Sequence, residues 1–137
     1  MKILALDLGD KWVGTAISDP LKISCKPHET VSLDDLYPFL EKLLAVQPID
    51  TVVVGYPTTL SGGTESDQTR KVVALKDELA ARFPDIKWLL WDERLSSKRA
   101  DQLKRATNKE EKVKSHSVAA AFILQGYLDY LAFQGQS

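Results

Sequence analysis

Two carboxylate-bearing segments stand out because each follows an apolar run directly. Asp7 follows Ile3–Leu6, and Asp92 and Glu93 follow Trp88–Trp91. A charge at the end of a buried strand is costly unless it is paired or binds a metal. Carboxylate oxygens are the hard ligands that suit Mg²⁺ or Mn²⁺ rather than zinc. A cation held there would activate water and neutralise charge on a phosphodiester, which is the chemistry of a metal-dependent nuclease.

If their strands lie side by side, these carboxylates converge. Ligands of an α/β sheet bind outside the carboxyl ends of strands, near a topological switch point. The alternative is structural: Asp7 caps a hairpin turn, and Asp92 caps the helix that follows it. Spacing along the chain leaves both interpretations open.

A β-hairpin is predicted to position the first carboxylate. Lys2–Leu8 is a β-prone apolar run, and Trp12–Ser18 alternates large with small residues as a strand should. Gly9–Lys11 is typical of the tight turn between antiparallel strands. A weaker third strand is predicted near Lys22–His28, after Pro20 ends the second.

Helices and further strands follow the hairpin. A helix beginning at Asp34 or Asp35 leaves Pro38 in its first turn, where the missing N–H does no harm. The other predicted elements are a buried strand over Asp50–Gly55, a loop over Tyr56–Gly63, a helix from about Thr64, a strand over Ile86–Trp91, a basic helix from Ser96 or Ser97 to about Ala106, a mobile segment over Thr107–Lys114, and a buried apolar helix over Ser117–Phe133.

This order of elements predicts one α/β domain over residues 1–137, a mixed five-stranded sheet with helices on both faces. The longest apolar stretch, Val118–Leu124, is too short for a membrane span of about 20 residues, so we expect no membrane partner. Asp7 comes too early for a signal peptide, and a single cysteine, Cys25, suits a reducing compartment. These features predict a cytoplasmic protein.

Basic residues are concentrated in one segment of a chain whose net charge is −1. Arg94–Lys114 holds eight cations and three anions, a local charge of +5, so the rest of the chain carries −6. Such asymmetry favours contact with nucleic-acid phosphates. The alternative is a solvated helix face followed by a loop.

Four blocks of sequence resemble the YqgF family, and they come in the family's order over nearly the whole chain. They are Leu4–Gly9 with Val13–Asp19, Val53–Pro57 with Ser61–Gly63, Trp91–Ser97, and Ala119–Gln125. The Asp-Glu-Arg-Leu-Ser block and the opening hairpin are specific when taken together. The resemblance implies a ribonuclease H-like fold and a bacterial nuclease that matures the 16S ribosomal RNA precursor; the family was earlier proposed to resolve Holliday junctions.

By the same resemblance, Asp7 and Glu93 are metal-binding catalytic carboxylates. Arg94 and the serines after it would position the substrate backbone. The full set of residues expected to contact nucleic acid is Lys11, Arg94, Ser96, Ser97, Lys98, Arg99, Lys104 and Arg105.

The third site residue departs from the family pattern. The family usually carries an Asp shortly before the Ala-Ala pair of its last helix, and this chain has His116 there. A neutral imidazole can bind a metal, and a helix N-terminus would favour the neutral form. It can also act as a general base toward water. The alternatives are a weakened site or a shifted register, which leaves His116 an ordinary surface histidine.

Other polar and aromatic residues have structural alternatives. Asp19 either faces the site or forms a turn before Pro20, and Trp12 either stacks on a base or packs in the core. Structural roles are predicted for the remaining candidates, Cys25, His28 and Trp88, and no spacing supports a zinc site.

The predicted function is therefore a Mg²⁺- or Mn²⁺-dependent hydrolase in ribosome biogenesis. Its expected partners are RNA rather than branched DNA, and pre-ribosomal particles, with the chain a monomer or weak homodimer. One alternative is a junction resolvase, whose symmetric cuts need two sites. Another is a binding scaffold without activity, and an actin-like phosphotransferase is disfavoured because it needs a second lobe around the nucleotide.

Overall fold

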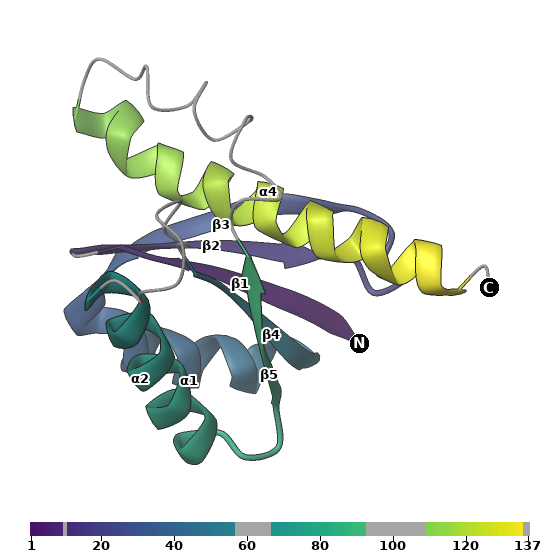
Figure 1. Cartoon of the computed structure of the whole chain (residues 1–137), viewed down its shortest axis with the longest axis horizontal. Helices are drawn as coiled ribbons and strands as arrows, with labels where there is room; N and C mark the ends of the chain where they lie inside the picture. The colour runs from purple at the N-terminus through teal and green to yellow at the C-terminus, as the bar shows by residue number, and fades with distance from the viewer. Residues whose placement is uncertain (10, 57–66, 93–108, 136–137) are drawn as a thin grey trace.

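The computed structural model describes residues 1–9, 11–56, 67–92 and 109–135 (Figure 1). Its centre is a five-stranded sheet of order β3-β2-β1-β4-β5. The strands are β1 Lys2–Leu8, β2 Trp12–Ser18, β3 Cys25–Ser32, β4 Ile49–Tyr56 and β5 Lys87–Asp92. β1, β2 and β3 form an antiparallel meander, while β4 pairs parallel with both β1 and β5. The predicted mixed sheet is confirmed, and β1 and β2 have the predicted bounds.

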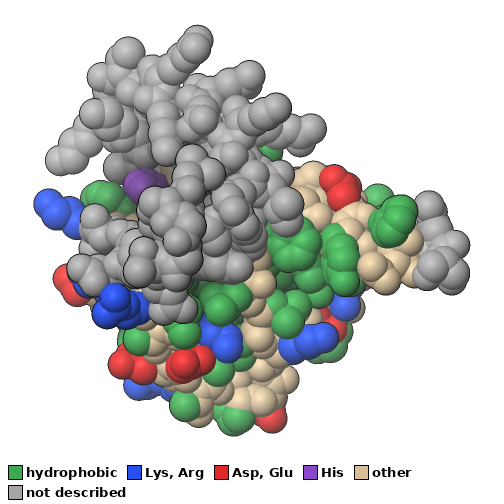
Figure 2. All heavy atoms as spheres, in the orientation of Figure 1, with side chains coloured by type: hydrophobic (Ala, Val, Ile, Leu, Met, Phe, Trp, Pro, Cys, Tyr) green, Lys and Arg blue, Asp and Glu red, His purple; other side chains and the backbone are tan. Residues whose placement is uncertain are grey.

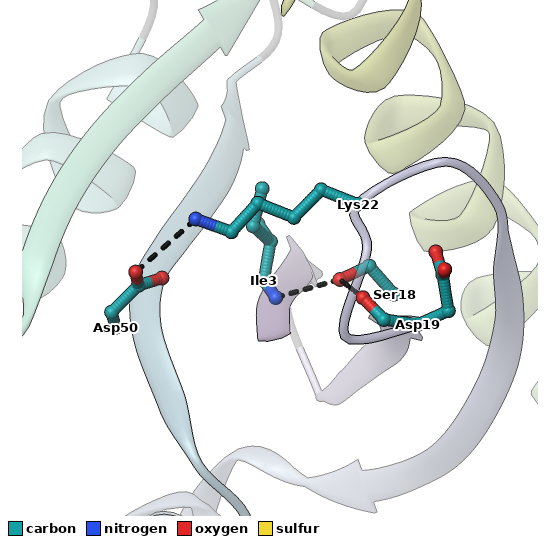
Figure 3. A network of polar contacts seen from close by, with 5 residues as sticks. All are labelled: Ile3, Ser18, Asp19, Lys22 and Asp50. Atoms are coloured by element: carbon teal, nitrogen blue, oxygen red, sulfur yellow. Dashed lines mark hydrogen bonds and ion pairs between the residues drawn. The ribbon is translucent and has the colours of Figure 1, made fainter. Parts of the chain in front are cut away.

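The third strand starts and ends later than predicted, because the residues before it form a turn. The carboxylate of Asp19 accepts hydrogen bonds from the backbone N–H groups of Ile23 and Ser24, at 2.8 and 2.9 Å. Within this turn Lys22 has a φ of 60°, which is incompatible with a strand. Figure 3 shows Asp19 and Lys22 on this loop, close to the start of β1.

The sheet lies between two helical layers (Figure 1). A 3-10 turn η1 Leu33–Asp35, α1 Leu36–Val46 and α2 Asp67–Arg82 cover one face, and α4 Lys109–Gly135 covers the other. β1 alternates between them: Leu4 and Leu6 pack with α1 and α2, whereas Ile3 and Ala5 pack with α4. The predicted helices on both faces are thus confirmed. The central run of β4 is buried throughout, as its β-branched sequence predicts.

The last helix begins eight residues earlier than predicted, at Lys109 rather than Ser117. The prediction of a mobile segment is therefore wrong for residues 109–114. The segment 109–114 consists mostly of Lys and Glu, which are strong helix formers. Such a sequence can extend a helix that packing already stabilises further along.

One face of α4 is buried against the sheet, as the prediction of a buried helix requires. Ala120, Leu124 and Leu128 recur every four residues and are at most 2% exposed. Near its end the helix leaves the sheet, where Tyr130 is 47% and Phe133 74% exposed. None of the helices described is long and apolar enough to cross a membrane.

Candidate metal and nucleic-acid site

Asp7 lies near the carboxyl end of the central strand, with a glycine on each side. It pairs with Gly14 of β2 and with Gly55 of β4. The alternation of β1 places Asp7 on the same face as Ile3 and Ala5, the face that α4 covers. Because neither neighbouring residue has a side chain, the carboxylate is not enclosed by the sheet around it.

His116 of α4 lies beside this carboxylate. Its Nδ1 is 3.9 Å from Oδ2 of Asp7, and the two side chains are 32% and 17% exposed. That separation is longer than a hydrogen bond. The described part of the chain donates no hydrogen bond to the Asp7 carboxylate. The structure therefore brings together two of the three predicted site residues.

The position of His116 in its helix corrects one prediction. We expected it at a helix N-terminus, where the helix dipole favours a neutral imidazole. Because α4 starts at Lys109, His116 lies two turns inside the helix, beyond the reach of that effect. Its place beside Asp7 comes instead from the packing of α4 on the sheet.

Two glycines of the hairpin contact the His116 turn of α4. A Cβ at Gly14 would overlap the carbonyl group of His116 and would lie 2.6 Å from the amide nitrogen of Ser117. A Cβ at Gly9 would lie 2.8 Å from the carbonyl oxygen of Trp12 and 3.4 Å from Cε1 of His116. Gly14 was not among the predicted site residues. The available signal was a glycine inside a strand pattern, which often marks a close backbone approach.

The second carboxylate segment does not lie next to the first. β4 separates β1 from β5, and Asp7, Gly55 and Trp91 form one row across the three strands. Two strand spacings amount to about 10 Å. The two strands therefore do not lie side by side, although both end at the same edge of the sheet. Glu93, the residue directly after β5, lies outside the described residues.

The predicted nucleic-acid contacts are described at one position only. Lys11 is exposed at the β1–β2 turn, at the same sheet edge as Asp7. Figure 2 shows acidic and basic side chains interspersed over the α1 and α2 layer, without a large patch of one sign among the coloured residues of this face. The other predicted contacts lie outside the described residues: Arg94, Ser96, Ser97, Lys98, Arg99, Lys104 and Arg105.

The lesser candidates have structural surroundings. The turn interpretation of Asp19 is confirmed by its backbone hydrogen bonds. Trp88 donates its indole N–H to the carbonyl of Phe83 and packs against the core, as predicted. Burial raises the pKa of Cys25 to about 11, with the nearby carboxylates of Asp129 and Asp19 adding to the effect, so this thiol is unreactive at neutral pH.

The remaining two candidates are less buried than core residues. His28 is exposed on β3, with its ring centroid 6.1 Å from that of Phe39 on the α1 side. Trp12 is half-buried at the start of β2. Among the described residues, neither side chain contacts Asp7.

A pocket of about 450 Å³ opens on the other face of the sheet, between α1 and α2. Its walls are mostly apolar, with Lys71 and Glu78 among the lining residues. Leu8 and Gly9 are among its lining residues. Leu8 packs with α1 and α2, on the face of the sheet that α4 does not cover. This pocket is therefore distinct from the place where Asp7 and His116 meet.

The donors of the site fit a divalent cation. A carboxylate and an imidazole face each other across a gap too long for a hydrogen bond, with a partly buried charge that a cation would neutralise. Within the described residues no group of three His, Cys, Asp or Glu side chains is assembled. Two protein ligands at one site suit Mg²⁺ or Mn²⁺, which keep several waters, better than a closed zinc site.

The sheet order and the antiparallel meander that leads into parallel strands define a ribonuclease H-like fold. The fold is similar to that of "T. thermophilus RuvC in complex with Holliday junction substrate", with a TM-score of 0.62 and 15% identity over 97% of this chain and 96% of that one. The "Thermus thermophilus RuvC structure" gives a TM-score of 0.53 at 16% identity, with 98% and 97% covered.

Sequence comparison identifies the family. The model described as "RuvX: Holliday junction resolvase" matches residues 1–130. A protein of Caldicellulosiruptor bescii named "Putative pre-16S rRNA nuclease" is 37% identical over 135 residues, 95% of this chain and 97% of that one. A protein of the same name from Agathobacter rectalis is 38% identical over 143 residues, with 96% and 97% covered. The chain belongs to the RuvX family, the same family as YqgF, which confirms the resemblance.

Proposed function

We propose that this protein is a divalent-metal-dependent nuclease that hydrolyses phosphodiester bonds of the 16S ribosomal RNA precursor. The observation that carries the proposal is the pair formed by Asp7 and His116, 3.9 Å apart at the carboxyl end of the central strand. Relatives at 37% and 38% identity, matched over nearly their full length, carry the name of this activity.

In this proposal Asp7, Glu93 and His116 hold the cation, Mg²⁺ or Mn²⁺. Such an ion, when bound, lowers the pKa of its water and neutralises charge on the scissile phosphate. Asp7 supplies a carboxylate oxygen that β1 fixes in place. His116 supplies Nδ1, and the rigidity of α4 keeps that atom directed at the same point. Glu93 follows β5, the strand that ends at the same sheet edge.

Substrate contacts are assigned to the basic residues near that edge. Lys11 and the segment Arg94–Arg105 would neutralise phosphates, so binding should weaken as salt is raised. RNA within pre-ribosomal particles is the preferred substrate of the proposal, with one domain over residues 1–137 acting in the cytoplasm as a monomer or weak homodimer.

A branched-DNA resolvase is the second candidate, favoured by one observation. The fold is shared with a resolvase solved on a Holliday junction, although 15% identity extends the likeness to the fold alone. Resolution of a symmetric junction needs two active sites, so this candidate also requires a dimer.

The test is a cleavage assay that offers a structured 16S precursor transcript and a four-way DNA junction side by side, each with Mg²⁺ and with Mn²⁺. Metal-dependent cutting of the transcript, abolished in Asp7→Asn, supports the proposal. Cutting confined to the junction, by a dimeric protein, replaces it with resolution. If neither substrate is cut while both proteins bind RNA equally, the chain is a binding scaffold and the proposal is wrong.

A further inference from the structure

The contact between Gly14 and α4 is tighter than that of any other glycine whose surroundings the structure describes. A Cβ at Gly14 would overlap the backbone of His116, whereas one at Gly126, further along the same helix, would lie 3.4 Å from Nε1 of Trp91. The first obstacle is helix backbone, which cannot rotate away. The second is the edge of the Trp91 indole, at 3.4 to 3.9 Å, which is ordinary van der Waals contact.

Space, rather than backbone conformation, explains the glycine at this position. Gly14 does not have the positive φ that favours glycine, and it pairs in register with Asp7 on one side and Thr30 on the other. A glycine inside a strand weakens the strand, since it loses more entropy on folding and has no side chain to pack. Its presence there therefore points to the close approach of α4.

The same turn of α4 determines where the His116 imidazole lies. The carbonyl of His116 rests on Gly14, while its ring reaches Gly9, whose added Cβ would be 3.4 Å from Cε1, and Asp7, whose Oδ2 is 3.9 Å from Nδ1. Any separation of this turn from β2 would carry the imidazole away from the carboxylate.

We propose that Gly14 is a positioning residue of the site: by seating the backbone of α4 on β2, it fixes the distance between His116 and Asp7. The role in metal binding rests on the proposed function, whereas the contact does not. A metal site needs its ligands held within about 0.5 Å of the working geometry, so a shift of the helix by the size of one methyl group is enough to disrupt it.

The experiment compares the whole chain with Gly14→Ala and with the matched control Gly126→Ala. Mn²⁺ affinity is measured by calorimetry, and the ε1-proton signals of the two histidines are followed by NMR with and without Mn²⁺. His28, exposed on β3 beside Phe39 of the opposite layer, is the internal reference. A metal-free readout is the nuclear Overhauser effect between the ε1 proton of His116 and the α protons of Gly9.

In the wild type and in Gly126→Ala, we expect Mn²⁺ to broaden the His116 signal before that of His28, and the Overhauser effect to Gly9 to be present. In Gly14→Ala we expect that effect to be lost and the Mn²⁺ affinity to fall about tenfold to a hundredfold, with helical circular dichroism retained. A folded Gly14→Ala that keeps both the Overhauser effect and the affinity overturns the proposal.

Two further outcomes are separable. If Gly14→Ala does not fold, Ala120→Val tests the same seating of α4 on the sheet, since Ala120 is fully buried one turn along α4 in the cluster that holds Ala5 and Ala16, and a larger side chain there lifts the helix. Retention of the Overhauser effect and of wild-type Mn²⁺ affinity in that variant contradicts the proposal. If the wild type binds no Mn²⁺ at Asp7, the proposed function fails, while the metal-free Overhauser effect still decides the role of Gly14 in placing His116.

Discussion

The polar groups at the two ends of the central strand β1 differ in how many partners they have. At its start, Figure 3 shows Ile3, Ser18, Asp19, Lys22 and Asp50 in a network of polar contacts. Ser18 accepts the N–H of Ile3 at 2.8 Å, and Lys22 lies 3.2 Å from Asp50. At the other end Asp7 has only His116, at 3.9 Å, among the described residues.

This difference separates two carboxylates that have structural partners from Asp7, the proposed metal ligand. The N–H of Ser24, with those of Ile23 and Leu21, lowers the pKa of Asp19 below its ordinary value. Burial by itself would raise the pKa of Asp50, but the ammonium of Lys22, the Thr51 side chain and the positive N-terminus outweigh it and lower the pKa. Asp7 is less exposed than Asp50 and has no such partner in the described chain. A partly buried carboxylate without a partner is what a metal ligand must be before the metal binds.

The substitution Asp7→Asn should have the largest effect on cleavage. Loss of the metal ligand should remove several kcal/mol of transition-state stabilisation, so cleavage should fall about a thousandfold. Because the carboxylate supports no described hydrogen bond, the melting temperature should be unchanged or slightly higher. Initial rates on the precursor transcript and a thermal melt check both. A large loss of stability would show that Asp7 is structural.

His116→Ala should have the next largest effect. Removing one metal ligand should weaken Mn²⁺ binding about tenfold to a hundredfold, with a parallel loss of cleavage at limiting metal. His116→Asp, which restores the carboxylate of the family pattern, should retain much of the activity. Calorimetry and rates at several Mn²⁺ concentrations provide the test. Full activity in His116→Ala would exclude a role for the imidazole.

Asp50→Asn should lower stability and leave cleavage unchanged, the opposite of what we expect for Asp7→Asn. The ion pair with Lys22 is about one-third exposed on both sides, so solvent screening limits its contribution. We expect a loss of about 0.5 kcal/mol, or about 2 °C in melting temperature, with cleavage unchanged. Urea unfolding and the transcript assay measure both quantities. Reduced cleavage by the folded variant would contradict a purely structural role for the start of β1.

The smallest expected effect is on acid stability. The pKa of Asp50 is lower in the folded protein than its ordinary value of 3.8, so the unfolded chain binds the proton first as the pH falls. The stability that this group contributes is complete above 3.8 and is lost as the pH falls through the folded pKa. Urea midpoints between pH 6 and pH 3 should therefore fall less steeply for Asp50→Asn. An unchanged slope would show that the ion pair does not contribute.

Several features followed from the sequence because they depend on local physical chemistry. The bounds of β1 and β2 came from alternation and a turn signal, and burial of the central run of β4 came from its β-branched residues. Asp7 was selected because a charge after an apolar run is costly wherever that run packs. The nature of the chemistry, hard oxygen ligands for a divalent ion, is likewise a property of the residue types.

The tertiary structure alone decided which of these residues meet. β4 lies between β1 and β5 because of how strands that are far apart in the sequence pair with one another. The spacing of residues along the chain does not predict that pairing. The start of α4 depends on packing further along the helix, which allows a polar segment before it to become helical. His116 lies beside Asp7 because the backbone of α4 rests on Gly14, more than one hundred residues earlier in the chain. The sequence determines the ligands that are available, and packing between distant segments determines the distance between them.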